Sequence, residues 1–249
     1  MDIALLIVLA GAAAAGFAQG VSGFAFSLVA LSVWAWTVEP QLAAPMAVFG
    51  SLAGQLVTLP FVWRGFEFRK LLPLAIGGLL GVPLGALLLA WLDPSLFKFG
   101  LGAFLLVYCP LMLVLPHSYV WPHGGRLADG LVGFAGGVLG GIGGISGPVP
   151  TLWTTLRGWS KDTQRGVLQA FNISMHVTTM TVYALKGAIT GEVLTLFAWI
   201  APALAIPAIL GVLLFRRLNA VAFRRLILSL LLVSGVVLVW GSVAAWISV

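Results

Sequence analysis

Apolar residues fill long, uninterrupted runs along this chain, and short polar stretches separate them. A helix needs about 20 apolar residues to cross a bilayer, and six runs reach or approach that length: 41–63, 70–91, 96–115, 163–185, 192–215 and 221–246. The runs are continuous rather than alternating, which favours helices over the strands of a closed barrel. The pattern therefore predicts an all-α polytopic membrane protein.

Two further apolar regions, 3–37 and 127–156, are too long for one ordinary helix, and glycines cut each near its middle. The second contains GGVLGGIGGISGPVP, from Gly136 to Pro150, in which seven of fifteen residues are glycine. The pieces after the cuts, 22–37 and 146–156, would reach only about 24 Å and about 16 Å as helices, against a hydrocarbon core of about 30 Å. We therefore expect each region to be a hairpin of short helices that turns inside the membrane.

The basic residues support this reading. If each hairpin region counts as an even number of crossings, 11 of the 13 Lys and Arg residues fall on one side of the membrane, and only Lys98 and Lys186 on the other. The positive-inside rule makes the basic side cytoplasmic. The residues on that side are Arg64, Arg69, Lys70, Arg126, Arg157, Lys161, Arg165, Arg216, Arg217, Arg224 and Arg225.

The two halves of the chain also resemble each other. The segment Gly16–Gly23 matches Gly133–Gly140 at six of eight positions, and residues 75–82 share a second pattern with residues 205–212. If each hairpin region crosses the membrane an even number of times, the two halves enter the membrane from opposite sides. We predict two inverted repeats, each a Gly-rich broken-helix hairpin followed by three transmembrane helices, an arrangement that many secondary transporters use. The expected repeats are 1–116 and 127–249, joined by a cytoplasmic linker at 117–126.

Composition narrows the classes further. Hydrophobic residues make up 61% of the chain and charged residues 8%, whereas a soluble domain carries about 25% charge. Cys109 is the single cysteine, which excludes disulfides within the chain and cysteine-based metal sites. His117 and His123 form no convincing metal site, no basic patch suggests nucleic acid, and no cofactor is expected. The opening MDIALLIVLAG has no Lys or Arg before its apolar run, which argues against a cleaved secretory signal.

Between Gly133 and Asn172 the sequence resembles the second-half signature of the sulfite exporter TauE/SafE family. The shared features are a Gly-rich turn with Gly143-Gly144, the pair Gly147-Pro148, a basic loop from Arg157 to Asp162, and a helix that opens with Arg165. Residues 16–31 look like the first-half counterpart, and the resemblance covers nearly the whole chain. It implies a membrane carrier for sulfite, sulfonates or related small organic anions. Ile145-Ser146 departs from the family pattern, which leaves the substrate open.

Candidate binding residues gather at the two glycine-rich breaks. A helix that begins at such a break presents free N–H groups and the positive end of its dipole, and Pro148 suits the first turn of such a helix. Two opposed helix N-termini would hold a small anion without a buried Lys or Arg, which costs about 2.5–3.5 kcal/mol at mid-bilayer, and we expect no basic side chain there. The expected binding residues at the breaks are Gly20, Ser22, Gly23, Gly143, Gly144, Ser146 and Gly147.

Polar residues in two of the spans complete the expected site. Asn172 and His176 lie one turn apart in the span 163–185, and Gln55 lies in the span 41–63. His176 could bind an anion or carry a coupled proton, or be a neutral histidine bonded to a neighbouring helix. For Gln55 the alternative to ligand binding is interhelical hydrogen bonding, which we prefer. Either Glu39 or Asp129 could be a coupling carboxylate, but we expect both to be solvated at the membrane interface. For the glycines the alternative is close helix packing through GxxxG pairs, which we prefer at Gly77, Gly81 and Gly85.

The sequence favours a secondary transporter, working as an exporter, of a small anion such as sulfite or an organosulfonate, with no enzyme activity. Its expected place is the cell membrane, as a multi-pass protein of the bacterial inner membrane in contact with the lipid bilayer. Proton coupling, a homo-oligomeric state and a non-sulfur organic anion as substrate stay open. A rhomboid-like intramembrane serine protease is the rival class, because Gly144–Gly147 reads GxSG and His176 follows. The same motif at Gly20–Gly23, with no histidine after it in that half, argues against it, and a purely structural membrane subunit is a third alternative.

Overall fold

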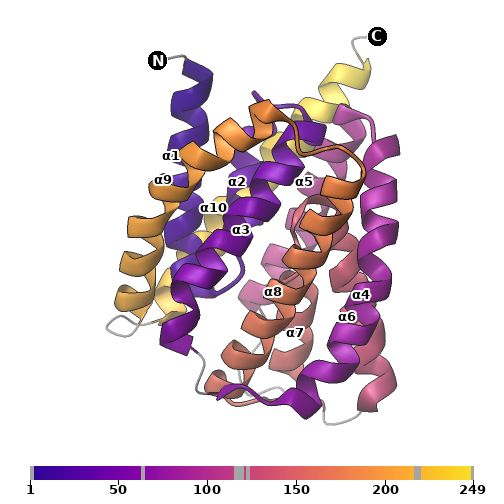
Figure 1. The fold of residues 1–249 in the computed structure, drawn as a ribbon, viewed down its shortest axis with the longest axis vertical. Coiled ribbons are helices and arrows are strands. Elements are labelled where there is room, and N and C mark those ends of the chain that lie inside the picture. Colours follow the sequence, from indigo (N-terminus) through magenta and orange to yellow (C-terminus); the bar gives the residue numbers. More distant parts are fainter. Residues whose placement is uncertain (1–2, 63–64, 115–120, 122–123, 216–219, 248–249) are drawn as a thin grey trace.

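The computed structural model describes residues 3–62, 65–114, 121, 124–215 and 220–247. Within these residues the chain forms ten α-helices and no strand, which confirms the predicted all-helical membrane architecture (Figure 1). The helices are α1 (Ile3–Ser22), α2 (Phe26–Trp34), α3 (Pro40–Val62), α4 (Phe68–Trp91), α5 (Pro94–Val114), α6 (Gly125–Gly143), α7 (Pro148–Leu156), α8 (Lys161–Leu185), α9 (Gly191–Phe215) and α10 (Ala220–Ile247).

Among the residues that the structure describes, five helices are long and apolar enough to cross a membrane, namely α1, α3, α4, α5 and residues 191–214 of α9. The 25-residue helix α8 is as long as α9 but carries many polar residues along its length. At 20 residues, α1 rises about 30 Å, so the first piece of the first hairpin is itself of membrane-spanning length.

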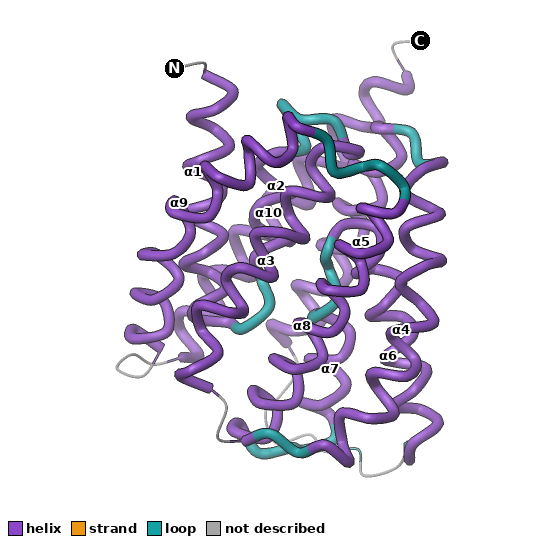
Figure 2. Tube along the Cα trace, viewed as in Figure 1, coloured by secondary structure: helices purple, strands orange, loops and turns teal. Residues whose placement is uncertain are grey.

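Both glycine-rich regions break as predicted. The chain leaves α1 at Gly23 and α6 at Gly144, both in the left-handed backbone region with φ of 89° and 73°, which glycine adopts without strain. The helices that follow, α2 and α7, have nine residues each, or about 14 Å. Figure 2 shows both connecting loops inside the body of the bundle, whereas the other loops drawn in teal lie at its two ends.

The two hairpins enter from opposite ends of the bundle. Near the N-terminus, the indole of Trp34 at the end of α2 donates a 3.2 Å hydrogen bond to the carbonyl of Val8 in α1. At the other end, where Figure 1 shows the start of α6 and the end of α7, the backbone N–H of Trp121 donates a hydrogen bond to the carbonyl of Leu156, the last residue of α7. Each hairpin therefore returns to the end from which it came.

The first helix of each hairpin packs against a long helix of the other half, α1 against α9 and α6 against α4. The matched glycines of the two halves make these contacts with backbone atoms, and the contacts are Gly16–Leu204 and Gly20–Ala208 for α1–α9, and Gly133–Leu74 and Gly137–Gly78 for α6–α4. The contacts thus repeat residue by residue, and the two halves are interlocked rather than side by side.

The glycines of α4 are packing residues, as predicted. Gly77, Gly81 and Gly85 face the backbone of α6, where an added Cβ would meet the carbonyls of Gly130, Phe134 and Val138. Such spacing lets membrane helices approach to backbone contact.

Several predictions fall on residues outside the described part of the chain. These are the basic residues Arg64, Arg216 and Arg217, both loop histidines, His117 and His123, and most of the linker 117–126.

Candidate functional site

The two hairpin breaks meet inside the protein. Gly147 lies against the side chain of Phe24, and Gly144 lies against Ser27 of α2 and Val48 of α3. The helix α7 begins at Pro148, with Gly147 as its N-cap, as the sequence predicted. The N-termini of α2 and α7 therefore lie close together in the interior, away from both ends of the bundle (Figure 2).

Ser146 and Asn172 connect the second break to α8. The Ser146 hydroxyl donates a 2.9 Å hydrogen bond to Oδ1 of Asn172, and both side chains are buried. Nδ2 of Asn172 is also buried but has no hydrogen-bond partner in the structure. An unpaired buried donor costs about 1–3 kcal/mol, so an acceptor placed beside this amide would offset that cost.

His176 lies one helical turn beyond Asn172 and is buried as well. Its Nδ1 has no hydrogen-bond partner, so the structure offers no neighbouring group that holds the ring at this nitrogen. Thr179, a further turn along α8, has a buried hydroxyl that also has no hydrogen-bond partner.

These residues belong to one polar face of α8, to which Arg165 also belongs. Polar side chains recur at intervals of three or four residues, which places them on one side of a helix. Tyr183 closes the face by donating a 2.6 Å hydrogen bond to the carbonyl of Gly141 in α6. The members of the face are Arg165, Gln169, Asn172, His176, Thr179 and Tyr183.

Gln55 supports the first break from α3. Its Nε2 donates a 2.8 Å hydrogen bond to the carbonyl of Gly23, and its buried Oε1 has no partner. The backbone carbonyl of Gln55 in turn accepts a 2.6 Å hydrogen bond from Nε2 of Gln169 in α8. Gln55 thus takes part in interhelical hydrogen bonding, the alternative reading, while it touches the break directly.

The two GxSG motifs are not structurally equivalent. Ser22 is the last residue of α1, and its Oγ accepts hydrogen bonds from the N–H groups of Phe24 and Ala25, at 3.3 and 3.1 Å. Ser146 instead follows the left-handed Gly144 and points to α8. The difference arises because α1 ends at the serine itself, whereas α6 ends at Gly143, before the motif.

Arg165 corrects the expectation that no basic side chain would lie at the breaks. Its guanidinium donates hydrogen bonds of 2.9 and 2.8 Å to the carbonyls of Val21 and Gly20, at the C-terminal end of α1. A cation is favourable there because the helix dipole is negative at this end. The sequence placed Arg165 among the basic loop residues, and its position one turn into α8 was the signal that its side chain could reach inward.

The remaining predicted glycines have packing contacts. Gly20 lies against Ala208 of α9, and Gly143, the last residue of α6, lies against the side chain of Leu31 in α2. Gln19 was not among the predicted residues; its Nε2 donates a 2.9 Å hydrogen bond to the carbonyl of Ser51, and its buried Oε1 has no partner.

Glu39 and Asp129 differ in their surroundings. Glu39 is exposed, as expected. Asp129 is only 6% exposed, and its carboxylate accepts a 2.7 Å hydrogen bond from the indole of Trp153 in α7. The expectation of a solvated Asp129 is therefore wrong, because α7 folds back over the start of α6.

The geometry does not provide the protease arrangement. The Ser146 hydroxyl is bonded to Asn172, and the described contacts include no hydrogen bond between Ser146 and His176. Among the described residues, no group of three or more His, Cys, Asp or Glu side chains is placed to hold a metal ion.

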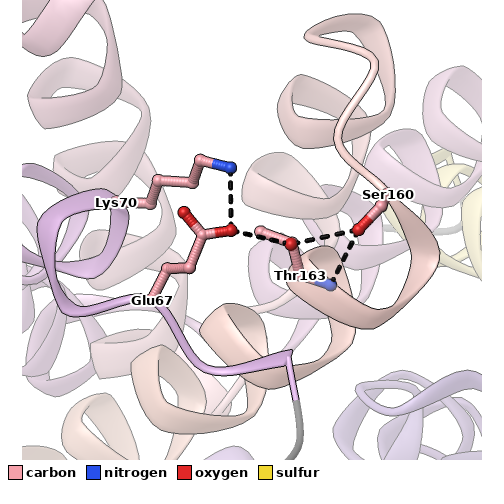
Figure 3. Close-up of polar contacts among 4 residues, drawn as sticks. All are labelled: Glu67, Lys70, Ser160 and Thr163. Carbon is pink, nitrogen blue, oxygen red and sulfur yellow. Dashed lines mark hydrogen bonds and ion pairs between the residues drawn. The ribbon is translucent and has the colours of Figure 1, made fainter.

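At one end of the bundle a carboxylate connects the starts of α4 and α8 (Figure 3). Glu67 accepts a 3.0 Å ion pair from Lys70 and a 2.8 Å hydrogen bond from the hydroxyl of Thr163. Ser160 caps α8 by accepting from the amide of Thr163 at 3.2 Å. The bonds from Lys70 and Thr163 lower the pKa of Glu67 below its usual value of 4.5. This link joins the starts of α4 and α8 at the surface of the protein.

The chain is similar to one known family over most of its length. The family model of the sulfite exporter TauE/SafE matches residues 7–238, which include both hairpin breaks and all the site residues named above. No curated protein and no solved structure gives a significant match. The chain therefore belongs to the sulfite exporter TauE/SafE family.

Proposed function

We propose that this protein is a secondary transporter that exports a small anion such as sulfite or an organosulfonate, and that the anion binds where the two hairpin breaks meet. One observation carries the proposal: beside the Ser146–Asn172 hydrogen bond, the Asn172 amide is a buried donor with no partner, directly at the start of α7. Family membership supports the transport of an anion across the membrane.

The chemistry around Asn172 suits a small anion. The N-terminus of α7 adds the positive end of a helix dipole at the same place, and Arg165 adds a full positive charge near the first break. Glu39 and Asp129, the acidic residues described near the hairpins, do not lie at the breaks. Glu39 is exposed, and Asp129 is bonded to Trp153. We propose Ser146, Asn172 and His176 as ligands, and Gln55 with the glycines at the breaks as their scaffold.

Access to this site requires movement. Ser146 and Asn172 are 0% and 1% exposed, so an anion reaches them only when the hairpins part from α8. The repeated contacts of α1 with α9 and of α6 with α4 support the inverted repeat, and with it an alternating-access movement of one half against the other. In this arrangement the basic end of the bundle faces the cytoplasm, and the anion leaves at the end that carries Lys98 and Lys186.

The test is uptake of radiolabelled sulfite, and of a short organosulfonate, into proteoliposomes that contain the purified protein. We expect saturable uptake above that of empty liposomes, and at least a tenfold reduction of its initial rate in Ser146→Ala. The control is Ser174→Ala, since this serine of α8 is only partly buried and bonds to the carbonyl of Ala170 in its own helix. Equal loss in both variants would contradict a site at Ser146. Uptake of a carboxylate in place of both sulfur anions would reassign the substrate to a non-sulfur organic anion.

A further inference from the structure

A groove of about 620 Å³ runs between α4 and α6 on the outer surface of the bundle, away from the hairpin breaks. Its walls are large apolar side chains that the protein itself leaves exposed, by 38% at the least. They are Leu72, Ile76 and Leu80 of α4, and Leu127, Leu131 and Phe134 of α6.

Two glycines lie at the floor of this groove, where α4 and α6 approach each other. Gly77 and Gly130 form part of its lining, and the two helices are so close there that an added Cβ on Gly77 would meet the carbonyl of Gly130. Gly77 therefore allows the two helices to reach backbone contact. At Gly130 an added Cβ would meet only the Pro73 carbonyl, at 3.7 Å, so the missing side chain there leaves room between the walls that a larger residue would fill.

One end of the groove is basic. Arg69 and Arg126 line it, and both are exposed in the first turns of their helices. The only ion pair within the described residues joins Lys70 to Glu67, so it involves neither arginine. The N-termini of α4 and α6 add the positive ends of two helix dipoles at the same end. The groove is therefore positive at its mouth and apolar along the rest of its length.

We propose that this groove binds one anionic phospholipid, with the phosphate between Arg69 and Arg126 and an acyl chain along the apolar walls. The guanidinium group of arginine binds phosphate through two parallel hydrogen bonds. Basic pockets between membrane helices bind anionic lipid head groups. From Arg69 to Leu80 the helix α4 rises about 16 Å, which is close to half of a hydrocarbon core of about 30 Å. The groove therefore has the depth of one leaflet.

A second copy of the chain fits this face less well. A symmetric contact places the same patch of both subunits together, so it would bring two pairs of arginines close to one another. A lipid instead neutralises the pair and covers the apolar walls. Because α4 and α6 belong to different halves of the chain, the bound lipid would hold the halves together.

The experiment measures lipid binding by the full chain in a mild detergent, by native mass spectrometry and by the shift of the melting temperature. The probes are phosphatidylglycerol, the zwitterionic phosphatidylcholine with the same chains, and glycerol phosphate as a head group without chains. We expect phosphatidylglycerol alone to be retained and to raise the melting temperature. The double variant Arg69→Gln/Arg126→Gln should bind it about tenfold more weakly or worse, since bonds to charged groups contribute about 1.5–3 kcal/mol.

Two further variants test the site itself. Gly130→Leu should weaken phosphatidylglycerol binding with both arginines intact, because it fills the groove; its Cβ would meet only the Pro73 carbonyl, at an ordinary 3.7 Å. Arg225→Gln removes an exposed arginine of α10 and should leave binding unchanged. Equal retention of phosphatidylcholine, equal stabilisation by glycerol phosphate, or unchanged binding in the double variant would overturn the proposal. A change of oligomeric state in Gly130→Leu, with lipid binding unchanged, would overturn it in favour of a subunit interface.

Discussion

The Ser146 hydroxyl donates a 2.9 Å hydrogen bond to Oδ1 of Asn172, across 26 positions of the sequence. This bond joins the break between α6 and α7 to the polar face of α8. It also orients the Asn172 amide, because the oxygen accepts from Ser146 and Nδ2 is left without a partner in the interior. A substitution can therefore keep the hydrogen bond from Ser146 and still remove the Nδ2 donor of Asn172.

Asn172→Asp tests the Nδ2 donor separately from the hydrogen bond to Ser146. The carboxylate still accepts from Ser146, but a second oxygen replaces the Nδ2 donor and a negative charge opposes the anion. We expect the initial rate of anion uptake into proteoliposomes to fall at least tenfold, and further than in Ser146→Ala, which keeps the donor. Elution of the purified variant as a single folded species is the control. Wild-type uptake by Asn172→Asp would rule out this amide as an anion ligand.

Arg165→Lys tests the contact at the end of α1. The lysine keeps the charge but cannot donate two parallel hydrogen bonds to the carbonyls of Gly20 and Val21. Since hydrogen bonds to charged groups contribute about 1.5–3 kcal/mol, we expect a lower melting temperature in detergent, and a larger drop for Arg165→Ala. Arg225→Lys, at an exposed position of α10, should change nothing. A melting temperature that stays at the wild-type value in Arg165→Ala would mean that the contact does not stabilise the fold.

Gly81→Ala and Gly211→Ala test whether the two halves pack alike. An added Cβ meets the carbonyl of Phe134 at the first position and that of Phe17 at the second. Because backbone cannot move aside cheaply, we expect each variant to be destabilised by about 1–3 kcal/mol, measured by denaturation in detergent. Gly100→Ala is the matched control, since nothing lies within 4 Å of its added Cβ. Loss of stability at only one of the two positions would weaken the inverted-repeat relation.

Acid should loosen the link between α4 and α8 (Figure 3). The pKa of Glu67 is lowered by its bonds to Lys70 and Thr163, so its contribution to stability is complete above its ordinary pKa of 4.5. It is lost as the pH falls through the lowered pKa in the folded protein. The melting temperature of Glu67→Gln should therefore lie below that of the wild type at pH 7, and the difference should shrink in acid. The effect should be small because Glu67 is exposed to solvent. A difference that does not change with pH would show that the carboxylate charge is not what stabilises this link.

The order of the helices could be predicted from the sequence because a bilayer imposes a strong local rule. Each apolar run must satisfy its own backbone hydrogen bonds within the membrane, so run length and glycine interruptions suffice to place helices. The breaks at Gly23 and Gly144, and the start of α7 at Pro148, followed from this rule together with the backbone freedom of glycine.

The candidate site was predicted only in part. Ser146, Asn172 and His176 stood out because a polar residue in an apolar run needs a reason. The roles of Arg165 and Gln19 could not be predicted, because they depend on where the end of a long side chain lies. The different roles of Ser22 and Ser146 could not be predicted either, because they depend on the residue at which each helix ends.

The sequence by itself determined the membrane location, the helical class, the two broken hairpins and the glycines that allow close packing. These properties are local, and each depends on residues near one another in the chain. Only the tertiary structure decided that α1 packs on α9, that Arg165 reaches the end of α1, and that the Asn172 amide is left unpaired beside the second break. Those outcomes arise from contacts between segments more than 100 residues apart or from the absence of a partner, and neither is encoded at a single position.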